Sequence, residues 1–101
     1  MRMPPLLPLS SVRASLIRME GWRLLPGRTP KLKKRYACGS FAGAMRFVNS
    51  VAGLAEQRDH HPNIDIRYDT VDVTLWTHAK GGVTELDLSL AGAIDTLAHS
   101  T

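Results

Sequence analysis

Apolar residues recur along this chain with two different spacings, and the changes of spacing divide it into helices and strands. Val12, Leu16 and Met19 follow each other at helical spacing, after two serines that can cap a helix and before a glycine that can end it. Helical spacing returns over residues 40–57 and again over residues 84–97. The pattern therefore predicts three helices.

The middle helix is the longest, and Ser40 stands where its cap is needed. One apolar stripe at helical spacing consists of Phe41, Ala44, Met45, Val48, Val51, Ala52 and Ala55. We expect this stripe to cover the sheet. Phe47 and Leu54 add a second stripe, which either widens the internal core face or meets another subunit. We favour the second alternative and predict a homo-oligomer.

Four segments show the alternation of period two that is typical of strands: residues 22–25, 32–38, 64–68 and 71–77. Asp69 and Thr70 separate the last two, which predicts a hairpin. Lys34 falls on the apolar face of the second strand, where we expect its ammonium to lie at the sheet edge. The order α-β-β-α-β-β-α predicts an α+β fold, a four-stranded antiparallel sheet with three helices packed on one face.

The length and charge of the chain limit the number of domains and the kinds of partner that it can have. The 101 residues correspond to one domain, which we place at residues 9–101 after a short N-terminal tail at residues 1–8. The net charge is +4, and a basic cluster at residues 31–35 favours either a nucleic-acid surface or a solvated strand face. No aromatic residues alternate with these lysines, so we expect no nucleic-acid partner. No apolar run reaches the roughly 20 residues that a membrane span needs.

The cysteine content and the composition of the N-terminal segment indicate the cellular compartment in which the protein works. Cys38 is the single cysteine, which excludes an intramolecular disulfide and is typical of a reducing compartment. The segment before Glu20 has arginines and serines but no acidic residue, as transit peptides do. We favour a cytoplasmic protein with a short tail over a targeting segment.

The candidate catalytic residues lie where the long helix ends, in the run from Glu56 through Asp59, His60 and His61 to Pro62. Histidine gains or loses a proton near neutral pH, so this pair suits acid–base catalysis. His78 ends the second strand of the hairpin, and the hairpin could bring it to the pair. A metal site is the alternative, with ligands drawn from His60, His61, His78, Asp59 and Asp87. We favour acid–base chemistry without a metal.

The spacing of these residues resembles the signature of the pterin-4a-carbinolamine dehydratase family, from about Leu9 to the C-terminus. The signature residues are Glu56, His60-His61-Pro62, Tyr68, His78 and Asp87, flanked by Gly21-Trp22, by the Phe41–Glu56 helix pattern and by Thr77-His78-x-x-Gly81-Gly82-x-Thr84. The resemblance implies the same α+β fold. It also implies dehydration of a 4a-hydroxytetrahydropterin to a quinonoid dihydropterin, with the pterin as substrate and no cofactor.

The resemblance also assigns roles to single residues. His60 and His78 correspond to the acids that serve the two faces of the pterin, and His61 corresponds to the substrate-binding histidine with some base character. Glu56, Asp59 and Asp87 are expected to orient imidazoles, and Thr77 to offer a hydrogen bond to the pterin. Asp87 also lies three residues after Thr84, a spacing that predicts a capping box, and both roles can hold together.

Two kinds of partner follow from the resemblance. Members of the family form homotetramers or homodimers, and the dehydratase serves aromatic amino acid hydroxylases by recycling their pterin cofactor. Some members instead bind a transcription factor as a dimerisation cofactor, through the same long helix. An interaction protein is therefore the alternative to an enzyme, and the intact set of histidines favours the enzyme.

Overall fold

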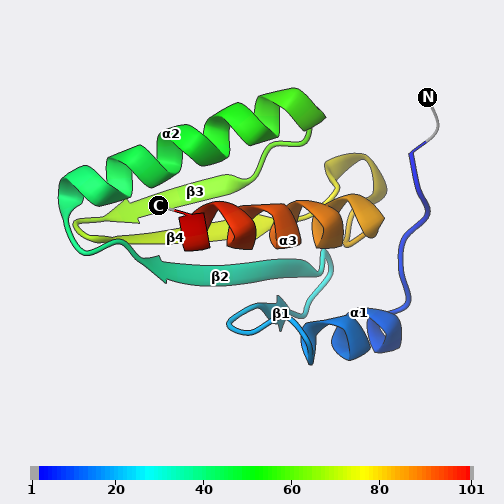
Figure 1. The fold of residues 1–101 in the computed structure, drawn as a ribbon. Coiled ribbons are helices and arrows are strands. Elements are labelled where there is room, and N and C mark those ends of the chain that lie inside the picture. The colour runs from blue at the N-terminus through cyan, green and yellow to red at the C-terminus, as the bar shows by residue number, and fades with distance from the viewer. Residues whose placement is uncertain (1–2, 101) are drawn as a thin grey trace.

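The computed structural model describes residues 3–100 and has the predicted α+β architecture (Figure 1). Its elements are α1 (Leu9–Leu16), β1 (Arg23–Leu25), β2 (Lys31–Ala37), α2 (Phe41–Arg58), β3 (Asn63–Arg67), β4 (Thr70–Leu75), the 3-10 helix η1 (His78–Lys80) and α3 (Glu85–Ser100). The strands form one sheet in the order β1-β2-β4-β3, and all neighbouring strands are antiparallel. Within residues 3–100, no helix has both the length and the apolar character to cross a membrane.

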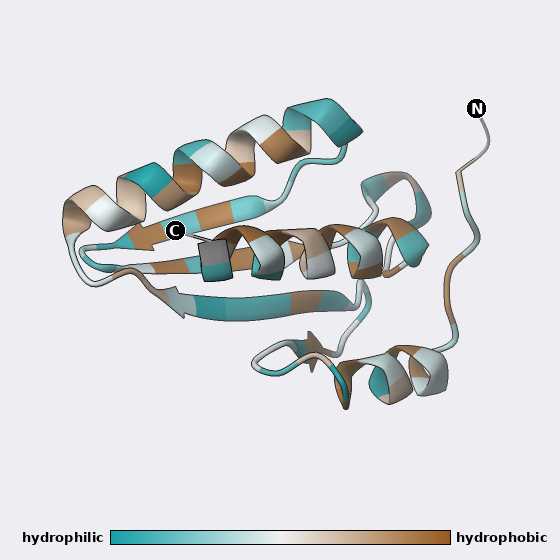
Figure 2. Ribbon diagram, in the orientation of Figure 1, coloured by the Kyte–Doolittle hydropathy of each residue, from teal (hydrophilic) through white to brown (hydrophobic). Residues whose placement is uncertain are grey.

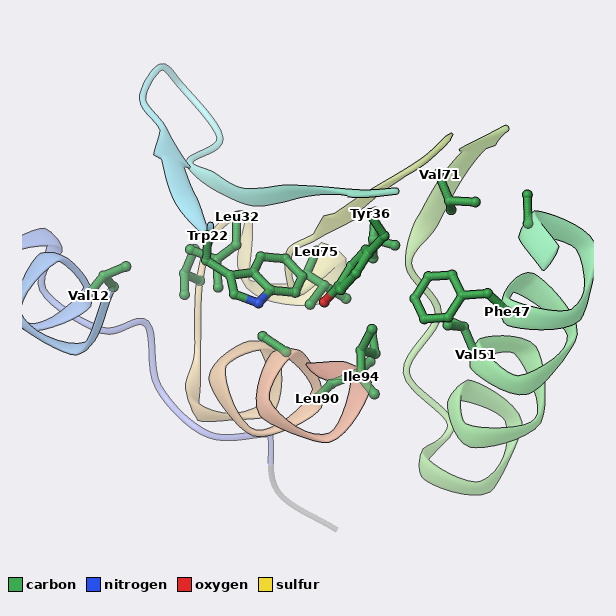
Figure 3. Packing of buried hydrophobic residues seen from close by; sticks show 14 residues of the cluster. Val12, Trp22, Leu32, Tyr36, Phe47, Val51, Val71, Leu75, Leu90 and Ile94 are labelled. Atoms are coloured by element: carbon green, nitrogen blue, oxygen red, sulfur yellow. The ribbon is translucent and has the colours of Figure 1, made fainter. Parts of the chain in front are cut away.

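The core lies between one face of the sheet and the helices (Figure 3). Leu32 and Leu75 project from adjacent central strands, and Leu90 and Ile94 meet them from α3. All four side chains are fully buried. Complete burial of a side chain of this size contributes about 1.5–3 kcal/mol, so these contacts fix α3 against β2 and β4.

Helix α2 faces the core with part of the predicted stripe, Ala44, Val51 and Ala55, and with Phe47 beside them. Phe47, assigned to the outer stripe, is buried and packs against Tyr36 with ring centroids 4.7 Å apart, and Leu54 also packs on the core (Figure 3). Phe41 and Met45, assigned to the core, are 53% and 36% exposed. The apolar positions cover about half of the circumference at roughly 100° per residue, so the pattern could not fix which part faces the sheet.

Ser40 caps α2 as predicted, because its hydroxyl accepts a hydrogen bond from the N–H of Gly43 at 2.9 Å. The predicted serine cap of α1 is wrong. That helix begins at Leu9, and the carbonyl of Pro8 accepts the N–H groups of Ser11 and Val12. The backbone carbonyl of Pro8 thus accepts the first hydrogen bonds of α1, and no serine side chain caps this helix.

Leu6 and Leu7, in the segment predicted to be an N-terminal tail, contact the domain. Leu7 packs against the core, and its N–H donates to the carbonyl of Val83 at 2.9 Å. Leu6 approaches Gly82, where an added Cβ would lie 2.9 Å from its Cδ2. In Figure 1 this segment runs beside the loop that contains η1. The N-terminal segment therefore covers the chain just after η1.

Lys34 lies just past the three residues of β2 that pair with β1, and its side chain is 16% exposed. Its ammonium forms an ion pair with Asp95 of α3 at 2.8 Å and donates to the carbonyl of Glu20 at 2.9 Å. The indole N–H of Trp22 and the hydroxyl of Tyr36 donate to the same carboxylate. Burial and then this hydrogen bond raise the pKa of Tyr36 above its usual value. Asp95 thus satisfies three polar groups that face the helix layer.

The opposite face of the sheet carries charged side chains, and Figure 2 shows β2 as largely hydrophilic. Arg35 of β2 donates two hydrogen bonds to Asp72 of β4, at 2.7 and 3.0 Å, and Lys33 lies 3.7 Å from the same carboxylate. The Arg35 guanidinium holds the pKa of Asp72 below its usual range. The basic cluster is thus partly a cross-strand ion-pair network.

The hairpin turn falls one residue earlier than predicted. Arg67 pairs with Thr70, so Tyr68 and Asp69 form the turn and Thr70 belongs to β4. Tyr68 has φ of 53° and is 73% exposed. Two-residue hairpin turns need a positive φ at a central position, and this geometry overrides the apolar alternation that suggested a longer strand.

Candidate active site

The predicted site residues come from four segments that meet at one end of the molecule. These segments are the end of α2, the loop that follows it, η1 with the residue before it, and the start of α3, on the right of Figure 1. Asp59 ends α2 in the left-handed conformation, with φ of 49°, and its N–H bonds to the carbonyls of Ala55 and Glu56. This turn sends His60 and His61 out of the helix in succession.

His60 is joined to Asp87 in the interior. Its Nε2 lies 2.6 Å from Oδ1 of Asp87, whose side chain is fully buried, and the His60 side chain is 10% exposed. The other carboxylate oxygen, Oδ2, accepts hydrogen bonds from the Thr77 hydroxyl at 2.8 Å and from the N–H of Thr84 at 2.9 Å. A buried carboxylate with several donors is held rigidly. Asp87 therefore fixes one edge of the His60 imidazole.

Asp87 also closes the predicted capping box at the start of α3. Its carboxylate accepts from the Thr84 N–H, while the Thr84 hydroxyl accepts from the N–H of Leu86 at 3.2 Å. The same carboxylate therefore starts a helix and orients His60. The two interpretations of Asp87 hold at once.

His61 points to the surface, where its Nε2 lies 3.0 Å from Oε1 of Glu56. The two side chains are 54% and 78% exposed. An exposed pair of this kind contributes about 0–1 kcal/mol, so it orients the ring without anchoring the fold. His61 is thus the member of the pair that a solvent-borne molecule can reach.

His78 begins η1 and is exposed. The backbone of Thr77 before it pairs with Gly82, and the N–H of Thr77 donates to the Gly82 carbonyl at 2.8 Å. Because the Thr77 hydroxyl also binds Asp87, His78 is tied by chain connectivity to the carboxylate that holds His60. Trp76 contacts the His78 ring, with centroids 4.2 Å apart. Trp76 is not among the predicted site residues, and its only signal in the sequence is its adjacency to Thr77 and His78.

Two predicted binding residues are engaged differently from the sequence expectation. The Thr77 hydroxyl is buried and bonded to Thr84 as well as to Asp87, so it supports the carboxylate instead of facing outward. Asp59 is exposed, and its backbone caps α2. Of the predicted set, the structure brings His60, Thr77 and Asp87 into direct contact and pairs His61 with Glu56.

The model of the pterin 4 alpha carbinolamine dehydratase family matches residues 5–97, which includes every residue of this site. The chain belongs to this family. The match also takes in part of the N-terminal segment that packs beside Val83.

Relatives in the family are similar over most of their length. A protein of Herpetosiphon aurantiacus named "Putative pterin-4-alpha-carbinolamine dehydratase" is 38% identical over 93 residues, which cover 92% of this chain and 94% of the relative. A protein of the same name from Dinoroseobacter shibae is 45% identical over 78 residues, covering 77% and 79% of the two chains.

Solved structures of similar proteins carry more than one functional description. A transcriptional coactivator/pterin dehydratase from Brucella melitensis aligns with a TM-score of 0.85 at 35% identity, covering 92% of this chain and 98% of that one. A pterin dehydratase-like protein identified as a RuBisCO assembly factor in the alpha-carboxysome aligns with a TM-score of 0.68 at 34% identity, covering 81% and 94%.

The predicted alternative of a metal site needs a cluster of ligand side chains. Within residues 3–100, no three histidine, cysteine, aspartate or glutamate side chains form a group that could hold a metal ion. His60 and His61 follow each other in the chain but bind different carboxylates, Asp87 and Glu56. Two imidazoles held by separate partners do not form the convergent ligand set that a metal needs.

A separate hollow of about 490 Å³ lies against the N-terminal half of α2, away from the histidines. Its lining includes Tyr36, Cys38, Gly43, Arg46, Phe47 and Ser50. Burial raises the pKa of the Cys38 thiol. The thiolate is the nucleophilic form of cysteine, so this environment works against covalent catalysis there.

Proposed function

We propose that this protein is a hydro-lyase that converts 4a-hydroxytetrahydropterin to quinonoid dihydropterin and water by histidine acid–base catalysis. The observation that carries the proposal is the buried contact between His60 and Asp87, next to the exposed pair of His61 and Glu56. One imidazole is rigid and partly buried, and the other is open to solvent. Such a pair can serve a reaction that needs a proton donor and a proton acceptor.

The proposed reaction moves one proton to oxygen and one from nitrogen. An imidazolium donates its proton to the 4a-hydroxyl, the C4a–O bond breaks with its electrons on oxygen, and water leaves. The lone pair of the neighbouring ring nitrogen forms the new C=N bond, and that nitrogen releases its proton to a base. His60 and His78 are the proposed donors on the two faces of the ring, with His61 binding the pterin and accepting the proton. The acid and base are restored by exchange with solvent, so the pterin is the only organic reactant.

The proposed division between the two donors predicts opposite preferences in two variants. His60→Ala and His78→Ala should each slow the dehydration of one 4a-hydroxy stereoisomer by about 10²-fold, the lower end of the usual effect of a positioned acid, and the other isomer much less. Stopped-flow measurement of kcat with each purified isomer checks this. Equal losses on both isomers in both variants would contradict the division of roles.

We further propose that the activity recycles the pterin cofactor of an aromatic amino acid hydroxylase in the cytoplasm. A coupled assay in which a purified phenylalanine hydroxylase supplies the 4a-hydroxypterin tests the first part. Added protein should then increase the steady rate of hydroxylation when the cofactor is limiting. An unchanged rate under these conditions would contradict the recycling role.

We propose a homo-oligomer, a tetramer or dimer, that forms through the outward apolar stripe of α2. The corrected stripe consists of the exposed side chains Phe41, Met45 and Ala52. Exposed aromatic and thioether side chains along one helix face of so small a domain favour association. Burial of each large side chain on association would contribute on the order of 1.5–3 kcal/mol.

The double variant Phe41→Asp, Met45→Asp should therefore give smaller species than the wild type, for which light scattering should report a multiple of 11.1 kDa. Gln57→Asp, an exposed change on another face of α2, is the matched control and should leave the mass unchanged. A wild type that is monomeric at micromolar concentration would contradict the proposal. The change Phe47→Asp is unsuitable here because Phe47 is a core residue.

An interaction protein is the second candidate function, and the same apolar stripe on α2 favours it. One of the two similar structures is of a transcriptional coactivator/pterin dehydratase and the other of a RuBisCO assembly factor, and these are functions of those proteins. For this chain, we propose that such a partner would compete with self-association at Phe41 and Met45. A wild type without dehydratase activity would favour this function over the enzyme.

A further inference from the structure

Trp76 lies directly against one of the proposed acids. Its ring centroid is 4.2 Å from that of His78, and the two ring planes meet at 41°. Trp76 directly follows β4. His78, two residues later, is the first residue of η1. Aromatic rings at this separation are in contact over part of their faces. The indole therefore restricts the directions in which the exposed imidazole can turn.

Trp76 is itself held by the neighbouring strand. The ammonium of Lys31, the first residue of β2, lies 4.8 Å from the indole centroid, a cation–π distance. The same ammonium donates to the carbonyl of Thr29 at 3.3 Å, which helps to hold it over the indole. Trp76 is half-buried, whereas His78 is exposed. The indole is thus the more restrained of the two rings.

The three histidines differ in what orients them. A buried carboxylate, Asp87, holds His60, and Glu56 holds His61. The ring of His78 lies against the indole of Trp76, with the ring centroids 4.2 Å apart. An exposed imidazole without such a contact would sample several staggered rotamers. Proton transfer requires the donor within hydrogen-bond reach of the leaving oxygen, so its orientation affects the rate.

We propose that Trp76 is the positioning residue of His78, holding its imidazole by ring contact in the orientation that delivers a proton to one face of the pterin. This inference rests on the proposed dehydratase function. It assigns to an indole the orienting task that carboxylates perform for the other two histidines. Trp76 then acts on turnover through His78 and not on the binding of the substrate.

Nuclear magnetic resonance tests the contact without any substrate. The indole ring current should shift a ring C–H resonance of His78 upfield, and Trp76→Leu should move that resonance toward its position in an unfolded peptide. The chain has four histidines, so His78→Asn suffices to assign the signal. Thr74→Ala, two residues earlier on the same face of β4, is the control and should leave the shift in place. An unshifted His78 resonance in the wild type would overturn the inference.

Kinetics with the two stereoisomers test the positioning role. Trp76→Leu should lower kcat about 10-fold for the isomer on which His78→Ala loses more, with KM unchanged and the other isomer unaffected. Trp76→Phe should restore most of this loss, because a phenyl ring can replace the contact. An equal loss on both isomers, a rise in KM alone, or no loss would each overturn the inference while leaving the dehydratase function standing. A wild type that dehydrates neither isomer would overturn the proposed function and this inference with it.

Discussion

His61→Ala should lose at least about 10²-fold in kcat for dehydration while remaining folded. A positioned acid or base contributes typically about 10²–10⁴-fold, and His61 is the proposed residue that serves both stereoisomers. The fold should tolerate the change because the side chain is 54% exposed and its partner Glu56 is exposed as well. Steady-state kinetics on each isomer measure the loss, and circular dichroism with thermal unfolding monitors the fold.

His99→Ala is the matched control for this variant. His99 is also exposed but lies near the end of α3, far along the helix from Asp87. Its loss should leave kcat unchanged. Near wild-type activity in purified His61→Ala protein would contradict the assignment of His61 as the residue that binds the pterin and accepts its proton.

Asp87→Ala should be the most destabilising change at the site, lowering the free energy of unfolding by about 3–5 kcal/mol. The variant leaves the Thr84 N–H and the Thr77 hydroxyl without their acceptor, and it leaves His60 without its partner. Each buried donor that loses its acceptor adds a desolvation cost. Urea unfolding followed by circular dichroism measures the change.

Two comparisons separate the structural role of Asp87 from its role at His60. Asp65→Ala removes a carboxylate whose exposed ion pair with Arg67 contributes about 0–1 kcal/mol, so its unfolding free energy should stay close to that of the wild type. Asp87→Asn keeps an oxygen that can accept from Thr84 and should lose less stability than the alanine variant. Stability within 1 kcal/mol of the wild type in Asp87→Ala would contradict the described network.

The order of elements and the caps of α2 and α3 could be predicted because local chemistry determines them, whereas the serine cap predicted for α1 is wrong. Ser40 and Thr84 stand where a hydroxyl must meet free N–H groups, and both positions are confirmed. Which apolar residues of α2 are buried could not be predicted in the same way. Phe47 and Phe41 occupy neighbouring parts of one wide apolar arc, and only contacts with Tyr36 decide which of them is buried. Such contacts join residues far apart in the chain.

The sequence predicts which residues form the candidate site but not how they contact one another. His60 and Asp87 were both proposed from the spacing, and the structure joins them across 27 positions of sequence. The hydroxyl of Thr77 was expected to face a ligand, but it lies on the buried side of the strand end and binds Asp87. Trp76 contacts His78 because Thr77 between them is extended, so the two side chains lie on the same side of the backbone.

The most direct test of the central claim is the rate at which 4a-hydroxytetrahydropterin disappears in the presence of purified protein. The pterin can be generated in the cuvette and its conversion to quinonoid dihydropterin followed by absorbance. The account predicts a rate that rises in proportion to wild-type protein and falls to nearly the uncatalysed rate with His61→Ala. A wild-type rate equal to the uncatalysed one, from protein shown to be folded, would contradict it.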